Sequence, residues 1–70
     1  MTFMKRLFNS GHTLEFKIED ANDLGWEVRE EEDDRIVKRA WLHNWSRVEQ
    51  TMTLFSVRAG RLEQAGWVEI

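Results

Sequence analysis

Apolar and charged side chains alternate along residues 12–19, and this is the clearest pattern in the chain. The apolar positions of this segment are Leu14, Phe16 and Ile18. Strict alternation is typical of a β-strand that buries one face and exposes the other. A shorter alternation predicts another such strand over residues 26–30, and residues 3–8 show a weaker version of the pattern. We therefore expect three strands in the first half of the chain.

Turn-forming residues separate these segments. Asn9, Ser10 and Gly11 favour a tight turn, because asparagine and glycine tolerate positive φ angles. Residues 20–25 are predicted to form a loop, and the acidic residues 31–34 the tip of a hairpin. Short connections of this kind join neighbouring antiparallel strands.

Residues 35–42 predict a fourth strand, but the sequence does not determine which of its faces points to the core. In regular alternation, one face carries Ile36, Ala40 and Leu42, and the other carries Val37 and Trp41. Both faces are apolar, and a shift of one residue in the strand pairing would exchange them. The pattern therefore predicts a strand but does not fix its register.

Apolar side chains then recur every three or four residues. Their positions are Trp45, Val48, Met52, Phe55, Ala59 and Leu62. This spacing keeps one stripe on one side of an α-helix, facing a core. Two starts of the helix compete: Asn44 can act as the N-cap, or Ser46 and Glu49 can form a capping box.

The end of this helix is better defined. Gly66 stands where a residue with positive φ terminates a helix. Trp67 and Leu62 are then the pair of side chains that touches in a Schellman ending. Residues 67–70 continue as a short extended tail.

The order of elements predicts an α+β fold, β-β-β-β-α. A four-stranded antiparallel β-meander would pack against one long C-terminal α-helix. Seventy residues fit a single small domain over residues 1–70. The predicted core comprises Leu14, Phe16, Ile18, Trp26, Val28, Trp45, Val48, Met52, Phe55, Ala59 and Leu62.

Composition limits how such a small domain is stabilised. Cysteine is absent, which excludes disulfides and thiolate metal sites. A chain of this length buries only about 60% of the surface that it exposes when unfolded. Tight packing around its four tryptophans, or association with a partner, must therefore supply stability. No apolar run approaches the ~18 residues that span a membrane, and no signal peptide is recognisable, so we expect a cytoplasmic protein without membrane contact.

No arrangement of residues predicts catalysis or cofactor binding. His12 and His43 are far apart in sequence. The acids of residues 30–34 are contiguous, so their side chains diverge instead of converging on a metal. The glycines are isolated and form no phosphate-binding loop. We therefore expect no catalytic, metal or cofactor site, no small-molecule substrate and no enzymatic activity.

Charge is distributed unevenly around a net value of −3. Residues 15–34 hold ten acids and two bases, whereas residues 35–61 hold six bases and one acid. Basic side chains interleave with aromatic rings in residues 38–47, a mixture found in proteins that bind single-stranded nucleic acids. The candidate contacts there are Lys38, Arg39, Trp41 and His43. Nucleic-acid binding is thus one alternative function, and an acidic decoy that inhibits a nucleic-acid-binding protein is a second.

Two aliphatic side chains lie on the back of the predicted helix. Leu54 and Val57 are opposite the core stripe, where a lone surface helix is normally polar. Arg47, Gln50 and Arg61 surround them on a helical wheel. These five residues form the predicted protein interface. The favoured function is therefore a non-enzymatic protein–protein interaction module, acting as a homodimer or as a subunit of a complex.

Overall fold

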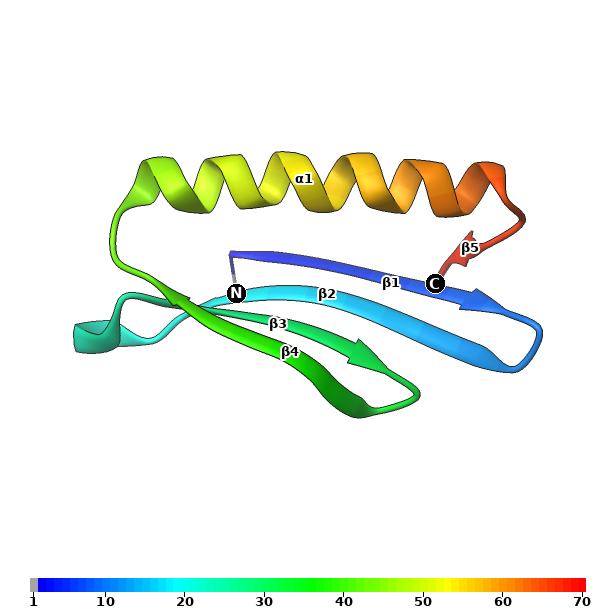
Figure 1. Cartoon of the computed structure of the whole chain (residues 1–70), viewed down its shortest axis with the longest axis horizontal. Helices are drawn as coiled ribbons and strands as arrows, with labels where there is room; N and C mark the ends of the chain where they lie inside the picture. Colours follow the sequence, from blue (N-terminus) through cyan, green and yellow to red (C-terminus); the bar gives the residue numbers. More distant parts are fainter. Residues whose placement is uncertain (1) are drawn as a thin grey trace.

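The computed structural model describes residues 2–70, which form one antiparallel sheet packed against one long helix (Figure 1). The elements are β1 (Phe3–Asn9), β2 (His12–Asp20), the 3-10 helix η1 (Asn22–Leu24), β3 (Trp26–Glu32), β4 (Arg35–Leu42), α1 (Trp45–Gln64) and β5 (Val68–Glu69). Neighbouring strands follow the order β4-β3-β2-β1-β5. The predicted α+β fold is confirmed, and a fifth strand is present because the C-terminal tail pairs with β1.

Residues with positive φ form the tight turns of the β1–β2 and β3–β4 hairpins. Ser10 and Gly11 have φ angles of 51° and 82° between β1 and β2, where the sequence predicts a turn. Asp33 and Asp34 have φ angles of 51° and 66° between β3 and β4. Two consecutive positive φ angles are typical of the type I′ turn that joins closely paired strands. The predicted hairpin tip of residues 31–34 is therefore shortened to two residues.

Asn44 caps the start of α1. Its side-chain oxygen accepts the backbone N–H of Arg47 at 3.0 Å and the hydroxyl of Ser46 at 2.8 Å. Because the helix already begins at Trp45, the alternative capping box starting at Ser46 is not the N-terminus.

The C-terminus of α1 has the predicted Schellman geometry. Gly66 has a φ angle of 106°. The N–H of Trp67 donates to the carbonyl of Leu62 at 2.9 Å, and the N–H of Gly66 donates to the carbonyl of Glu63 at 3.1 Å. Trp67 and Leu62 are both partly buried and pack against the core. This ending turns the chain back toward the sheet, where the N–H of Ile70 reaches the carbonyl of Arg6 in β1 at 2.9 Å.

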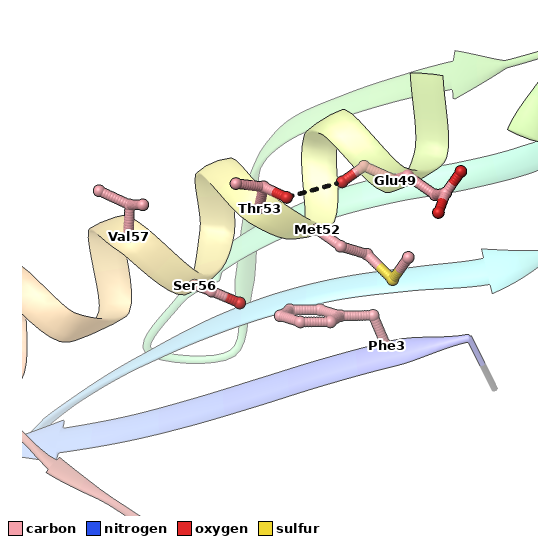
Figure 2. A pocket seen from close by; sticks show the side chains of 6 residues that line it. All are labelled: Phe3, Glu49, Met52, Thr53, Ser56 and Val57. Carbon is pink, nitrogen blue, oxygen red and sulfur yellow. Dashed lines mark hydrogen bonds between the residues drawn. The ribbon is translucent and has the colours of Figure 1, made fainter. Parts of the chain in front are cut away.

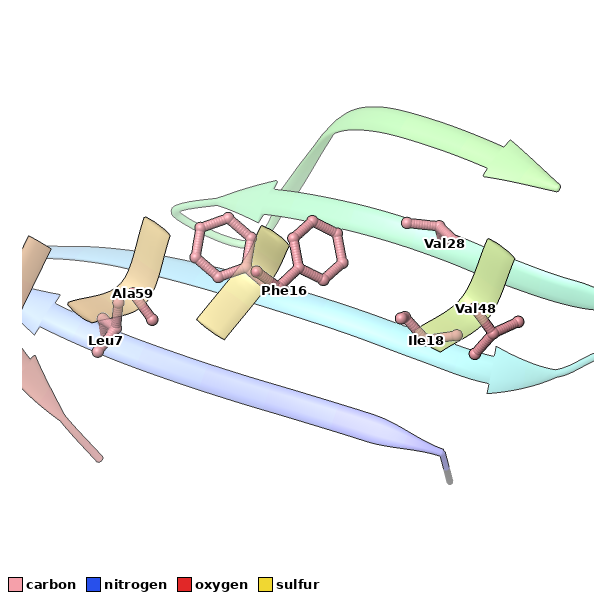
Figure 3. Packing of buried hydrophobic residues seen from close by; sticks show 7 residues of the cluster. Leu7, Phe16, Ile18, Val28, Val48 and Ala59 are labelled. Atoms are coloured by element: carbon pink, nitrogen blue, oxygen red, sulfur yellow. The ribbon is translucent and has the colours of Figure 1, made fainter. Parts of the chain in front are cut away.

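The core lies between α1 and the strands beneath it (Figure 3). Its buried residues are Leu7, Phe16, Ile18, Val28, Val48, Phe55 and Ala59. Phe16 of β2 and Phe55 of α1 stack with their ring centroids 4.9 Å apart. The guanidinium of Arg58 lies 4.8 Å from the centroid of the Phe16 ring and covers its edge of the core.

Five predicted core residues are not fully buried: Trp26, Met52 and Leu62 are partly buried and pack against the core, whereas Leu14 and Trp45 are not part of it. Trp45 was wrongly placed in the core, because its side chain is 48% exposed. It is the first residue of α1, and its indole packs against Trp26, with ring centroids 5.7 Å apart. Leu14 is half-buried, whereas its partner across the sheet, Leu7, is fully buried. The predicted stripe is thus correct from Val48 onward.

A β-bulge fixes the register of β4. Ala40 pairs with Val28 and Lys38 pairs with Glu30, but Ile36 pairs with Glu31, so Val37 is an extra residue. Ala40 and Leu42 pack against the core. The extra residue reverses the alternation, which moves Ile36 to the opposite face of the sheet. The regular alternation that grouped Ile36 with Ala40 and Leu42 is therefore wrong at this one position.

Candidate functional site

A single helix lies over a sheet of five strands, and a groove runs along each of its flanks. The groove between α1 and β4, here called the α1–β4 groove, has a volume of about 240 Å³. Its lining residues are Val28, Glu30, Lys38, Ala40, Leu42, Thr51, Leu54, Phe55 and Arg58. Five of these side chains are aliphatic or aromatic, and the three charged ones belong to neighbouring positions on β3, β4 and α1. The groove therefore combines an apolar floor with a small charged cluster.

The charged cluster of the α1–β4 groove carries a net positive charge. Glu30 has a side chain only 12% exposed, and its Oε1 accepts the Arg58 guanidinium at 2.8 Å. The Nζ of Lys38 lies 3.9 Å from the other Glu30 oxygen, and its side chain is 72% exposed. Arg58 is thus held by Glu30 and by the ring of Phe16, whereas the exposed Lys38, at the limit of ion-pair distance from Glu30, can also meet another anion.

The groove on the other flank of α1 has a different character (Figure 2). It lies against β1 and is larger and more open, with a volume of about 600 Å³. Its lining residues are Phe3, Glu49, Met52, Thr53, Ser56 and Val57. The Met52 and Phe3 side chains face each other between helix and strand, and Glu49 is the one charged residue of the lining. This second groove is therefore shallow and acidic, where the first is basic.

All five residues of the predicted protein interface are exposed on α1. Leu54 is 62% exposed and Val57 is 46% exposed. They belong to different flanks, because Leu54 lines the α1–β4 groove and Val57 lines the groove against β1. Arg47 and Arg61 are seven residues, about two turns, from Leu54 and lie on its side of the helix. Gln50 lies between Arg47 and Leu54 on the same exposed surface.

The predicted nucleic-acid contacts do not converge. Lys38 lines the α1–β4 groove on the helix-facing side of β4. Arg39 and Trp41 alternate with it and lie on the outer face of the sheet, turned away from α1. The Arg39 guanidinium is held there by Glu27 at 2.7 Å. His43 is exposed in the connection between β4 and α1.

The outer face of the sheet carries rows of like charge that cross the strands. One row contains Lys17, Arg29 and Arg39, and the acidic rows on either side contain Glu19 with Glu27 and Glu15 with Glu31. Ion pairs join adjacent rows, among them Lys17–Glu19 at 2.8 Å and Arg29–Glu19 at 3.5 Å. The side-chain hydrogen bond from Lys17 lowers the pKa of Glu19. The acids considered for a decoy surface thus face bases of their own sheet.

Polar contacts join the turn of the β3–β4 hairpin to the start of β2. The Nδ1 of His12 lies 3.0 Å from one Asp33 oxygen, and the Thr13 N–H donates to the other at 2.9 Å. The hydrogen bond with His12 lowers the pKa of the Asp33 carboxyl most, and the bond from the Thr13 N–H lowers it further. Within residues 2–70, no group of three or more histidines, cysteines and acids is placed to hold a metal ion. Nor does α1 have the length and apolarity needed to cross a membrane.

Sequence reasoning missed part of the α1–β4 groove. Arg58 was not among the predicted contacts, although it follows Leu54 by four residues, a spacing that places both on one side of a helix. The sequence does not show that Ala40 and Leu42 face the helix, because it does not determine the register of β4. Glu30 is one of the contiguous acids of residues 30–34 that were expected only to diverge, whereas its side chain is nearly buried and accepts the Arg58 guanidinium.

Comparison with family models, with curated proteins and with solved structures finds no match for this chain. Its function must therefore be inferred from the surfaces described above.

Proposed function

We propose that this chain is a non-enzymatic interaction module of the cytoplasm that binds another protein through the α1–β4 groove. The observation that carries the proposal is the apolar floor of that groove, with Leu54 62% exposed at its rim. Exposed apolar side chains gathered around a concave surface are typical of protein-binding sites. Partner binding would also cover surface that one helix leaves open in a small chain without disulfides.

Charge favours a different protein over a second copy as the partner. An antiparallel, two-fold helix contact centred on Leu54 would bring Arg47 of one copy against Arg61 of the other, since each is seven residues from the centre. Like charges at both ends of the contact would oppose it. Nucleic acid is less favoured because Trp41 and Lys38 lie on opposite faces of β4 and cannot serve one strand of bases and phosphates together.

The test uses a matched pair of substitutions. Leu54→Glu places a carboxylate in the α1–β4 groove, and Val57→Glu places the same group in the groove against β1. Both positions are exposed, so both variants should fold. We expect a protein to co-purify in stoichiometric amount with the wild type and with Val57→Glu, and to be lost with Leu54→Glu.

Light scattering on the purified chains separates the alternatives. A wild-type dimer that Leu54→Glu dissociates would identify the second copy as the partner, contrary to the charge argument. If the wild type, Leu54→Glu and Val57→Glu all co-purify the same proteins, the α1–β4 groove is not the binding site.

A further inference from the structure

We propose that the partner contributes an extended acidic segment that adds to the free edge of β4 as a further strand and places alternate side chains in the α1–β4 groove. This inference rests on the proposed function, and it specifies the chemistry and the conformation of what the groove binds. Three features of the structure carry it: the state of the β4 edge, the position of the groove beside that edge, and the distribution of charge around both.

The first feature is the edge itself. β4 is the last strand of the sheet, and among the described residues it pairs only with β3. An edge strand presents backbone N–H and C=O groups that another strand can bind. The bulge at Val37 disrupts the half of β4 nearest the hairpin turn, but residues 38–42 keep a continuous register with β3. Five regular residues are enough for a short strand to pair with.

The second feature is that the groove continues from this edge. Ala40 and Leu42 point from β4 toward α1 and form part of the groove floor, and Leu54 forms the rim above them. A strand added beside residues 38–42 would send every second side chain to this same face of the sheet. Aliphatic side chains at those positions would lie under Leu54. The groove and the edge are thus two parts of one surface, which a helical ligand would use only in part.

The third feature is the charge. β4 carries Arg35, Lys38 and Arg39 and no acid. Acids of β3, the strand that pairs with β4, neutralise two of these bases: Glu30 stands opposite Lys38, and Glu27 forms an ion pair with Arg39. Arg35 stands opposite Glu32 but forms no ion pair within residues 2–70, and no described strand covers the free side of β4. A strand on that side therefore fits best when it is acidic, as β3 is.

The helix reinforces this preference. Its side toward Leu54 carries Arg47, Arg58 and Arg61, and neither Arg47 nor Arg61 forms an ion pair with another described residue. The same distribution opposes a second copy, because two β4 edges side by side would set three bases against three. It also opposes basic peptides.

Selection from a displayed library of random peptides tests the proposal without knowledge of the partner. The wild type, Leu54→Glu and Val57→Glu serve as targets. We expect the wild type and Val57→Glu to enrich peptides in which acids accompany aliphatic residues at every second position. Such peptides should bind Leu54→Glu roughly tenfold more weakly or worse. A further variant, Lys38→Glu, should shift the selected peptides from acidic toward basic residues.

Backbone methylation of a selected peptide tests the strand itself. In a strand paired on one side, every second N–H points at the partner. Methylating that set of amides should weaken binding roughly tenfold or more, and methylating the alternate set should leave it nearly unchanged. Equal effects of the two sets would overturn strand addition.

The other outcomes separate this inference from the proposed function. Selected peptides with apolar residues spaced three and four apart, lost on Leu54→Glu, would show that the groove takes a helix: the strand inference is then wrong and the proposed function stands. Enrichment of basic peptides by the wild type would refute the acidic character of the ligand and leave strand addition standing. Binding of a random single-stranded DNA oligonucleotide that Lys38→Glu abolishes, with no Leu54-dependent peptide, would overturn both.

Discussion

Gly25 is the position where one added methyl group is expected to destabilise the protein most. Its backbone has φ 86° and ψ −124°, a conformation that side chains with a Cβ rarely adopt. A Cβ there would also overlap the carbonyl oxygen of Leu42 at the end of β4. Gly66 shares the positive φ, 106°, but within residues 2–70 the space around its Cβ position is open. The same substitution at the two sites therefore separates backbone strain from steric overlap.

The two contributions can be estimated separately. Gly66→Ala should lower the free energy of unfolding by about 1–2 kcal/mol, the cost of a Cβ in the left-handed region. Gly25→Ala should carry the same strain and, in addition, a displacement of the Leu42 backbone that costs on the order of 1–3 kcal/mol. Together these amount to roughly 2–5 kcal/mol, a large part of the ~5–10 kcal/mol expected for a chain of this size.

Urea unfolding followed by tryptophan fluorescence measures both losses, provided that the slope with denaturant is unchanged. If Gly25→Ala is no less stable than Gly66→Ala, the chain absorbs the overlap with Leu42 without cost, and the reasoning is refuted. Because Leu42 lines the α1–β4 groove, Gly25→Ala should also weaken partner binding, whereas Gly66→Ala should not.

Three further changes test the architecture. Asn44→Ala should cost about 1 kcal/mol of stability by removing the N-cap, whereas Glu49→Ala should cost little; equal losses in urea unfolding would contradict the cap assignment. The pKa of Asp33 is lowered from its usual 3.8, chiefly by the hydrogen bond with His12, so its stabilising effect is present above that pH and is lost as the pH falls through the lower folded value. Asp33→Asn should therefore show a weaker loss of melting temperature in acid than the wild type, and superimposable acid profiles would rule this out. Phe16→Ala should cost roughly 3–5 kcal/mol, and a calorimetric loss below about 1 kcal/mol would mean that the stack on α1 contributes little.

Much of the fold follows from local patterns in the sequence. The alternation of residues 12–19 predicts β2 because its apolar side chains lie on the face toward α1 and its charged ones on the outer face, where they pair with one another. The ends of α1 are predictable for a similar reason: Asn44 and Gly66 act on backbone groups only a few residues away. These features need no knowledge of distant parts of the chain.

The features that depend on distant contacts are less predictable. The bulge at Val37 is invisible in an apolar segment, because both phases of the alternation place hydrophobic residues on both faces. Trp45 continues the helical stripe in sequence, yet its exposure depends on what lies beneath the first turn of α1. The separation of Leu54 from Val57 depends on which strand flanks each side of the helix, and no spacing within α1 contains that information.

On the outer face of the sheet, directly opposite positions carry like charges, and ion pairs between diagonal and same-strand neighbours offset their repulsion. In the native pairing Lys17 stands opposite Arg29 and Glu19 opposite Glu27, so like charges face each other across strands. A slip of two residues between β2 and β3 would set Lys17 opposite Glu31 and Glu19 opposite Arg29, while keeping each side chain on its present face. The inner face opposes the slip, because Ile18 would then meet Glu30 in place of Val28.

The core therefore favours a register in which directly opposite surface charges are alike. Trimming Ile18 or Val28 would do more than leave a cavity, because it would also weaken a barrier to the slipped pairing, to which the hydrogen bonds of the Ala21–Gly25 loop and the bond from Thr13 to Asp33 contribute as well. Such variants should populate two registers, and added salt, by screening the like-charged pairs, should return them toward the native one.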